Sequence, residues 1–140
     1  MRKRNKLFIF FVTMFLIVGC SNGIKNEANK IVIEKLVDGL DKYEPFNEVS
    51  NNKDVQSVNE ILNSIKWEYK NVNMNQSPEY KFHFEDTNSK ASGSIYELMI
   101  IHSRENIALV VASKGMYVQL DKEKSEKLIK LITGGNLSED

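Results

Sequence analysis

The sequence has few of the residue types that most often carry chemistry. Its 140 residues include one cysteine and two histidines. A single cysteine excludes an intramolecular disulfide. No serine stands in a Gly-x-Ser-x-Gly pattern, the usual setting of a hydrolase nucleophile. Gly134 and Gly135 follow a helical pattern instead of preceding one, so they do not predict a phosphate-binding loop.

The histidines, His83 and His102, are the natural candidates for a metal site, with Glu85 or Glu97 as a further ligand. Neighbouring strands could bring the two rings together. Zinc sites, however, usually have three or four ligands at a fixed spacing, and here neither the spacing nor a thiol is present. We therefore expect a solvated His83, a His102 that pairs at a strand end, and neither a metal nor another cofactor.

Carboxylate pairs are the remaining catalytic candidates. Glu34 with Asp38, and Asp121 with Glu123, stand at spacings that also fit a solvated face or a helix cap. No base or nucleophile accompanies either pair in a known pattern. The sequence thus predicts no catalytic residue and a protein that is not an enzyme.

Acidic residues are absent from the first nineteen positions. Arg2, Lys3, Arg4 and Lys6 come first, and the twelve uncharged residues 7–18 follow. A spanning helix needs about 20 apolar residues, so this run is too short for one. A basic start followed by a short apolar run is typical of a signal peptide.

The end of that run resembles the lipobox of bacterial lipoproteins. It reads Ile17-Val18-Gly19-Cys20, with a branched residue at −3 and a small residue at −1. The resemblance implies cleavage between Gly19 and Cys20, loss of residues 1–19, and a diacylglycerol thioether on Cys20. It leaves open whether the new amino group is acylated, for example by palmitate. The alternative is a plain secretory peptide with a chance or buried cysteine.

Charge limits the choice of partners. The chain has 19 basic and 19 acidic residues, and removal of the four basic residues before Cys20 leaves 15 against 19, a net charge of −4. A mildly acidic surface argues against nucleic acid as a partner.

Residues 21–29 are polar and predict a tether that reaches at most about 30 Å at roughly 3.3 Å per residue.

The pattern of the mature part predicts a single α+β domain over residues 30–135, with a frayed tail at 136–140. It has two layers, an antiparallel meander sheet of about five to six strands with two amphipathic helices on one face. The expected order is a strand at 31–37 (or a helix), an extended connection at 43–49, a helix at about 54–65, strands at 66–74 (with a bulge near Asn71), 80–85, 95–102, 107–112 and 116–120, and a helix capped by Asp121 that ends at Gly134.

The strand at 95–102 has two apolar faces. If Tyr96, Leu98 and Ile100 face the helices, then Met99 and Ile101 lie on the second face beside Glu97. A partner protein could cover that face, or else a loop or the N-terminal segment of the same chain. Most aromatic residues on the predicted strands are expected in the core: Trp67, Tyr69, Tyr80, Phe82, Phe84, Tyr96 and Tyr117.

Three segments together resemble the small lipoproteins of bacilli that carry a YhfM-like domain. They are Ile65-Lys66-Trp67-Glu68, Ser77-Pro78-Glu79-Tyr80-Lys81-Phe82 and Met116-Tyr117-Val118-Gln119-Leu120. The resemblance covers most of the mature chain. It implies lipidation, a Gram-positive source and a location on the outer face of the cytoplasmic membrane. It implies no catalytic residue.

Two functional hypotheses follow, with a purely structural role in the envelope as a third. The first is a membrane-anchored accessory lipoprotein that binds an envelope protein or peptide through the open face or an edge of its sheet. The alternative is a small-ligand-binding or enzymatic envelope lipoprotein, for which a deep pocket lined by polar groups would be the mark.

The lipid anchor predicts the behaviour of one variant. Cys20→Ser should release the protein into the medium or leave it uncleaved, because serine does not take up the lipid. Membrane fractionation and the intact mass of the product measure this. An unchanged distribution together with an unchanged mass would contradict the anchor.

Overall fold

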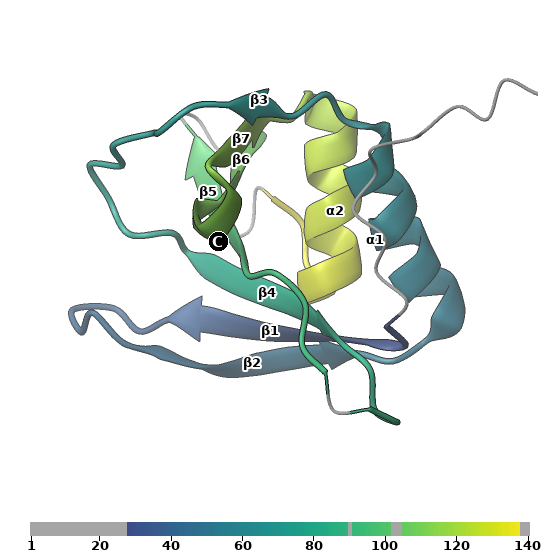
Figure 1. Ribbon diagram of the computed structural model, residues 1–140. Helices are drawn as coiled ribbons and strands as arrows, with labels where there is room; N and C mark the ends of the chain where they lie inside the picture. The colour runs from purple at the N-terminus through teal and green to yellow at the C-terminus, as the bar shows by residue number, and fades with distance from the viewer. Residues whose placement is uncertain (1–27, 90, 102–104, 138–140) are drawn as a thin grey trace, which may run out of the picture.

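The computed structural model describes residues 28–89, 91–101 and 105–137. These residues form seven strands, two α-helices and one 3₁₀ turn (Figure 1). In chain order they are β1 Lys30–Leu36, β2 Tyr43–Val49, α1 Asn52–Ser64, β3 Glu68–Tyr69, β4 Tyr80–Glu85, β5 Tyr96–Ile101, β6 Asn106–Val111, the 3₁₀ turn η2 Ala112–Lys114, β7 Met116–Gln119 and α2 Lys122–Thr133.

The strands form one antiparallel sheet in the order β2-β1-β4-β5-β6-β7-β3. Strands β4 to β7 are a meander, as predicted, and the β1–β2 hairpin adds to its β4 side. Both helices pack on the same face of the sheet (Figure 1). The α+β class with two helices on one face is therefore confirmed, and β1 is a strand and not the rival helix.

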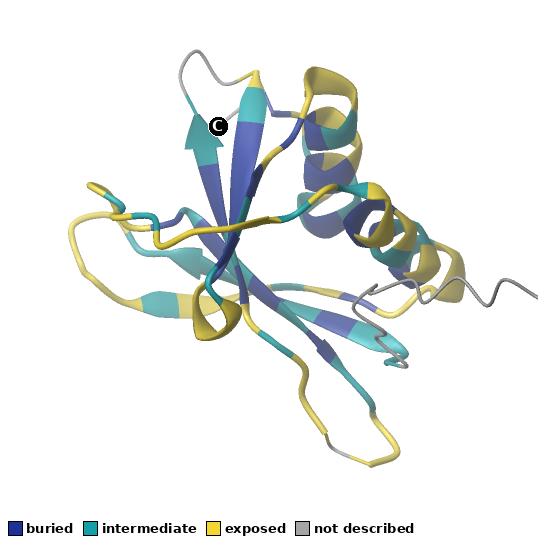
Figure 2. Ribbon diagram, turned by 45° about the horizontal axis from the view of Figure 1, so that its top comes forward, coloured by how far each residue is buried: buried dark blue, intermediate teal, exposed yellow. Residues whose placement is uncertain are grey.

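The core lies between the helices and one face of the sheet (Figure 2). Alternate residues of β1 and β4 point into it, and Tyr80, Phe82 and Phe84 are almost completely buried. The rings of Phe82 and Tyr96 stack with their centroids 5.0 Å apart. Such aromatic pairs add to the apolar burial that holds the helices on the sheet.

The helix boundaries follow from local caps. The Asn51 side chain accepts hydrogen bonds from the amides of Lys53 and Asp54 at the start of α1. Asp121 does the same for the Lys124 amide at the start of α2. Gly134 ends α2 with φ +76°, a conformation that glycine adopts without a Cβ penalty. The caps at Asp121 and Gly134 agree with the sequence prediction, whereas the pattern before the first helix left its cap open among Asn51, Asn52 and Asp54.

The segment 43–49 is a strand and not only an extended connection. Pro45 weakens the strand signal, since proline cannot donate to a ladder, but it is tolerated here because β2 is an edge strand. A register shift opposite Ile33 and Glu34 leaves Phe46 as a bulged residue. The count of seven strands exceeds the expected five to six because β2 joins the sheet.

The predicted strand at 66–74 is mostly wrong. Only Glu68 and Tyr69 pair with β7, and residues 70–79 form a loop in which Asn71 is not a bulge. At the other end of the chain, Leu137 is buried against the core inside the tail that we expected to fray. Residues 138–140 of that tail lie outside the described part of the chain.

One buried hydroxyl ties α2 to the sheet. Ser125 is completely buried, and apart from the tyrosines Tyr80 and Tyr96 no other side chain with a polar group is buried in the described residues. Its Oγ accepts a hydrogen bond of 3.1 Å from the Ile107 amide and lies 3.5 Å from the Leu120 carbonyl oxygen. The hydroxyl therefore satisfies a backbone donor that water cannot reach.

Replacing this hydroxyl should be costly. Ser125→Ala leaves the Ile107 amide unsatisfied, and we expect it to lower the free energy of unfolding by about 1–3 kcal/mol. Urea denaturation measures the change. The exposed Ser113 supplies the control, since Ser113→Ala should leave stability nearly unchanged. Equal stability of both variants would refute this role of Ser125.

Candidate functional site

The outer edge of β7 is only partly paired. In the antiparallel ladder the Leu120 amide donates to Ile107 of β6, so Leu120 faces β6 and its neighbour Gln119 faces outward. Gly115 and Tyr117 also direct backbone groups away from β6, toward β3. The Lys70 amide donates to Gly115, and Glu68 pairs with Tyr117.

The next pairing in this series would join Lys66 to Gln119. In the described part of the chain no backbone hydrogen bond joins them. The outward N–H and C=O of Gln119 thus lack a strand partner, and the residue is exposed. We call this position the open rung.

The packing of Trp67 explains why β3 begins only at Glu68 and does not include Lys66. Its indole N–H donates to the Leu62 carbonyl oxygen at 3.2 Å, and its ring lies 6.2 Å from the ring of Tyr96. Packing of the indole against the core turns the chain away from β7 before Lys66 can pair. Burial of a large aromatic ring outweighs one exposed ladder hydrogen bond, which contributes only about 1 kcal/mol.

An open groove lies beside the open rung, where segment 65–68 and the end of β7 separate. Its volume is about 550 Å³. One wall comes from the chain around β3, and the other comes from β7 and the first turn of α2. The lining residues are Ile65, Lys66, Glu68, Lys70, Tyr117, Val118, Gln119, Leu120, Asp121 and Lys124.

Charged side chains in the groove are paired, with one exception. Lys70 lies 3.0 Å from Glu68 and above the ring of Tyr117, at 4.4 Å from its centroid. Lys124 lies 3.0 Å from Asp121. Lys66 is exposed and has no ion-pair partner among the residues that the structure describes. The groove therefore presents one uncompensated positive charge in a domain that is acidic as a whole.

A loop covers the second face of β5. Met99, Ala108 and Val110 form a small apolar cluster on the face away from the helices, and Met74 from the 70–79 loop packs on it. The sequence analysis named a partner protein, a loop and the N-terminal segment as possible covers, and the structure shows a loop in contact with this face through Met74. Tyr96 and Leu98 face the helices as expected.

The two carboxylates that we considered as metal ligands, Glu85 and Glu97, form ion pairs with lysines. His83 is half-buried on the face away from the helices, and Glu85 lies 2.9 Å from Lys30. Glu97 lies 3.6 Å from Lys81. No group of three or more His, Cys, Asp or Glu side chains with metal-binding geometry occurs in residues 28–89, 91–101 and 105–137. His102 lies outside those ranges.

The other sequence candidates are spread over the molecule. Glu34 lies on β1 and Asp38 in the turn after it, whereas Asp121 caps α2 and Glu123 follows in its first turn. Of the aromatic residues expected in the core, Tyr69 is 79% exposed and Tyr117 packs on the small cluster at the opposite face, so neither enters the core under the helices. The open rung was not predicted, because the sequence reads as one strand through Trp67.

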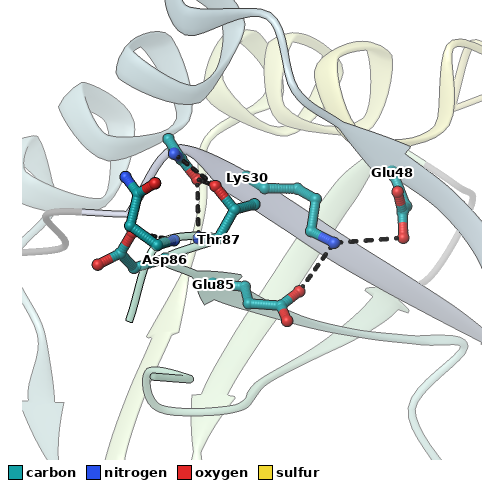
Figure 3. Close-up of polar contacts among 7 residues, drawn as sticks. Lys30, Glu48, Glu85, Asp86 and Thr87 are labelled. Atoms are coloured by element: carbon teal, nitrogen blue, oxygen red, sulfur yellow. Dashed lines mark hydrogen bonds and ion pairs between the residues drawn. The ribbon is translucent and has the colours of Figure 1, made fainter. Parts of the chain in front are cut away.

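The start of the domain is held by a polar cluster, which we call the clasp. Figure 3 shows Lys30 between Glu48 and Glu85, at 3.5 and 2.9 Å. Beside it, the Asn29 amide group donates to Thr87 Oγ1 at 2.9 Å and accepts from the Thr87 amide at 3.2 Å. The hydrogen bond that the Lys30 ammonium donates to the Glu85 carboxylate is the main cause that raises the pKa of Lys30 above its usual value.

The predicted signal peptide, cleavage site and lipidation residue, Gly19 and Cys20 included, lie outside the described residues. None of the described helices combines the length and apolar composition needed to cross a bilayer.

Asp121, in the groove wall, predicts a pH dependence. Hydrogen bonds from the Lys124 amide and then from its side chain lower the pKa of Asp121 below 3.8. A carboxylate with a depressed folded pKa stabilises the fold above the unfolded value and loses this effect as the pH falls through the folded value. Asp121→Asn keeps a neutral cap without the charge. Wild type should therefore melt above this variant at neutral pH, and the difference should close in acid.

Thermal melts followed by circular dichroism measure this difference. Asn51→Ser changes the cap of α1, which does not titrate, and its melting difference from wild type should not depend on pH in the same range. A gap for Asp121→Asn that stayed constant into acid would contradict the role of the charge.

Comparison with known proteins identifies the family. Among solved structures, a thioesterase-like protein from Clostridium sporogenes matches with a TM-score of 0.50 and 12% identity, over 77% of this chain and 97% of that chain. At this identity the likeness concerns the fold alone. No curated protein matches the chain. The YhfM protein family matches residues 24–137, so the resemblance predicted from the sequence is confirmed, and the chain belongs to the YhfM family.

Proposed function

We propose that this YhfM-family protein is a lipid-anchored lipoprotein on the outer face of the cytoplasmic membrane that binds an envelope protein or peptide. In this proposal the Cys20 thioether holds the domain at the membrane, and the edge of the sheet at β7 is the binding surface. Activity resides in binding, without a catalytic step, and nucleic acid is not a partner.

The observation that carries the proposal is the open rung beside the groove. An edge strand with free backbone groups is a template for another extended chain, and many recognition domains bind peptides in this way. The opposite edge is much less suitable. There, Pro45 has no N–H, Phe46 forms a bulge, and Glu44 and Glu48 add charge.

An enzymatic or small-ligand role has weaker support. The thioesterase-like neighbour shares the fold, and a 12% identity carries no residue across. The groove is wide open and its carboxylates, Glu68 and Asp121, are each paired with a lysine. A small-molecule site would more typically be a deep, mostly apolar cleft.

Site-specific photocrosslinking in intact cells tests the proposal. A benzophenone amino acid placed at Gln119 of the full chain should give one dominant crosslinked product that mass spectrometry identifies as an envelope protein. The matched control places the same group at Glu44, an exposed position on the protected edge. The yield there should be several-fold lower.

The anchor supplies a second control. In a Cys20→Ser background the product at Gln119 should fall, because the domain no longer stays near its partner. Equal crosslinking from Gln119 and Glu44, or none above background from either position, would overturn the proposal.

A further inference from the structure

We propose that the groove at β7 binds an extended peptide segment that carries an acidic side chain, with the backbone read at Gln119 and the carboxylate at Lys66. This inference rests on the proposed binding function and names the class of ligand. Two separate features, one of backbone geometry and one of charge, support it.

Backbone geometry favours an extended ligand. The ladder between β3 and β7 continues through Gly115 and Tyr117 and then lacks its partner at Gln119. An extended segment that entered the groove would supply the missing acceptor and donor in the phase already set by these two residues. A peptide in a helical conformation would satisfy its own backbone groups and gain nothing from this position.

The charge of the groove favours a carboxylate. Its three lysines are Lys66, Lys70 and Lys124, and its two carboxylates already pair with Lys70 and Lys124. Lys66 is left with its charge uncompensated among the described residues. A carboxylate next to Lys66 would gain a charge-assisted contact, whereas a lysine on the ligand would meet net repulsion.

The groove lies about one helix length from the first residues of the described domain. The clasp fixes the chain at Asn29 and Lys30, beside the end of β2 (Figure 3). Helix α1 begins next to that point, and Ile65, which follows its last residue, lies in the groove wall. Its 13 residues span about 20 Å at a rise of about 1.5 Å per residue. The start of β1 and the segment that follows α1 thus lie at opposite ends of α1, as Figure 1 shows.

A library of random heptapeptides displayed on phage is the probe, and the target is the full chain purified in detergent. Recovered peptides should contain Asp or Glu well above their frequency in the unselected library. Their dissociation constants, measured by fluorescence anisotropy, should rise at least tenfold with Lys66→Glu. Binding should also slow hydrogen exchange in a peptic fragment that contains Gln119.

A matched control is available at the other end of α1. Lys53 is exposed and, like Lys66, has no ion-pair partner in the described part of the chain. Lys53→Glu makes the same charge change, and it should alter the dissociation constants less than twofold. Lys66→Arg keeps the charge and should retain binding. Thermal melts of all three variants separate loss of binding from loss of folding.

Several outcomes would overturn the inference. The first is a set of recovered peptides without an excess of Asp or Glu. The second is an equal loss of peptide affinity for Lys53→Glu and Lys66→Glu. The third is a Lys66→Glu variant that changes only self-association or binding to anionic vesicles. If crosslinking from Gln119 still identified an envelope protein, the binding function would stand and only the acidic ligand would fall. If acidic peptides bound but the cellular crosslink failed, the function would fall instead.

Discussion

Burial of one apolar face of the sheet under two helices is the constraint on which the rest of the molecule depends. Tyr80, Phe82, Phe84 and Tyr96 form an aromatic layer that the helices cover. Trp67 extends this layer by packing next to Tyr96, and it therefore leaves the path that a longer β3 would follow. The open rung at Gln119 is a direct consequence of filling the core.

The two edge strands of the sheet, β2 and β3, differ in how well they are protected against pairing with another chain. Exposed edges invite pairing with other chains, and proteins protect them with proline, charge and bulges. Edge β2 has all three, in Pro45, Glu44 and the bulge at Phe46. Edge β3 is two residues long and leaves Gln119 of β7 bare. This asymmetry is the strongest physical reason to place a binding function at the second edge.

Polar contacts at the start of the domain complete the arrangement. Asn29 and Lys30 are fixed by hydrogen bonds and ion pairs that come from β2 and from the end of β4. These contacts join the chain to the fold at the point where the predicted tether ends. A lipid on Cys20 would hold this end of the domain within about 30 Å of the membrane.

The sequence by itself determined the class of fold, because strand alternation, helix periodicity and the caps at Asn51, Asp121 and Gly134 are local signals. Its lipobox pattern also predicts the anchor at Cys20, and family membership follows from sequence similarity alone. Tertiary structure decided where β3 begins, that Pro45 lies in an edge strand, and that Met74 packs against the cluster of Met99. Each of these depends on which distant residues compete for the same space. Alternation through Trp67 reads as a continuous strand, and only the packed core reveals that the indole breaks the ladder and leaves Gln119 and Lys66 exposed in one groove.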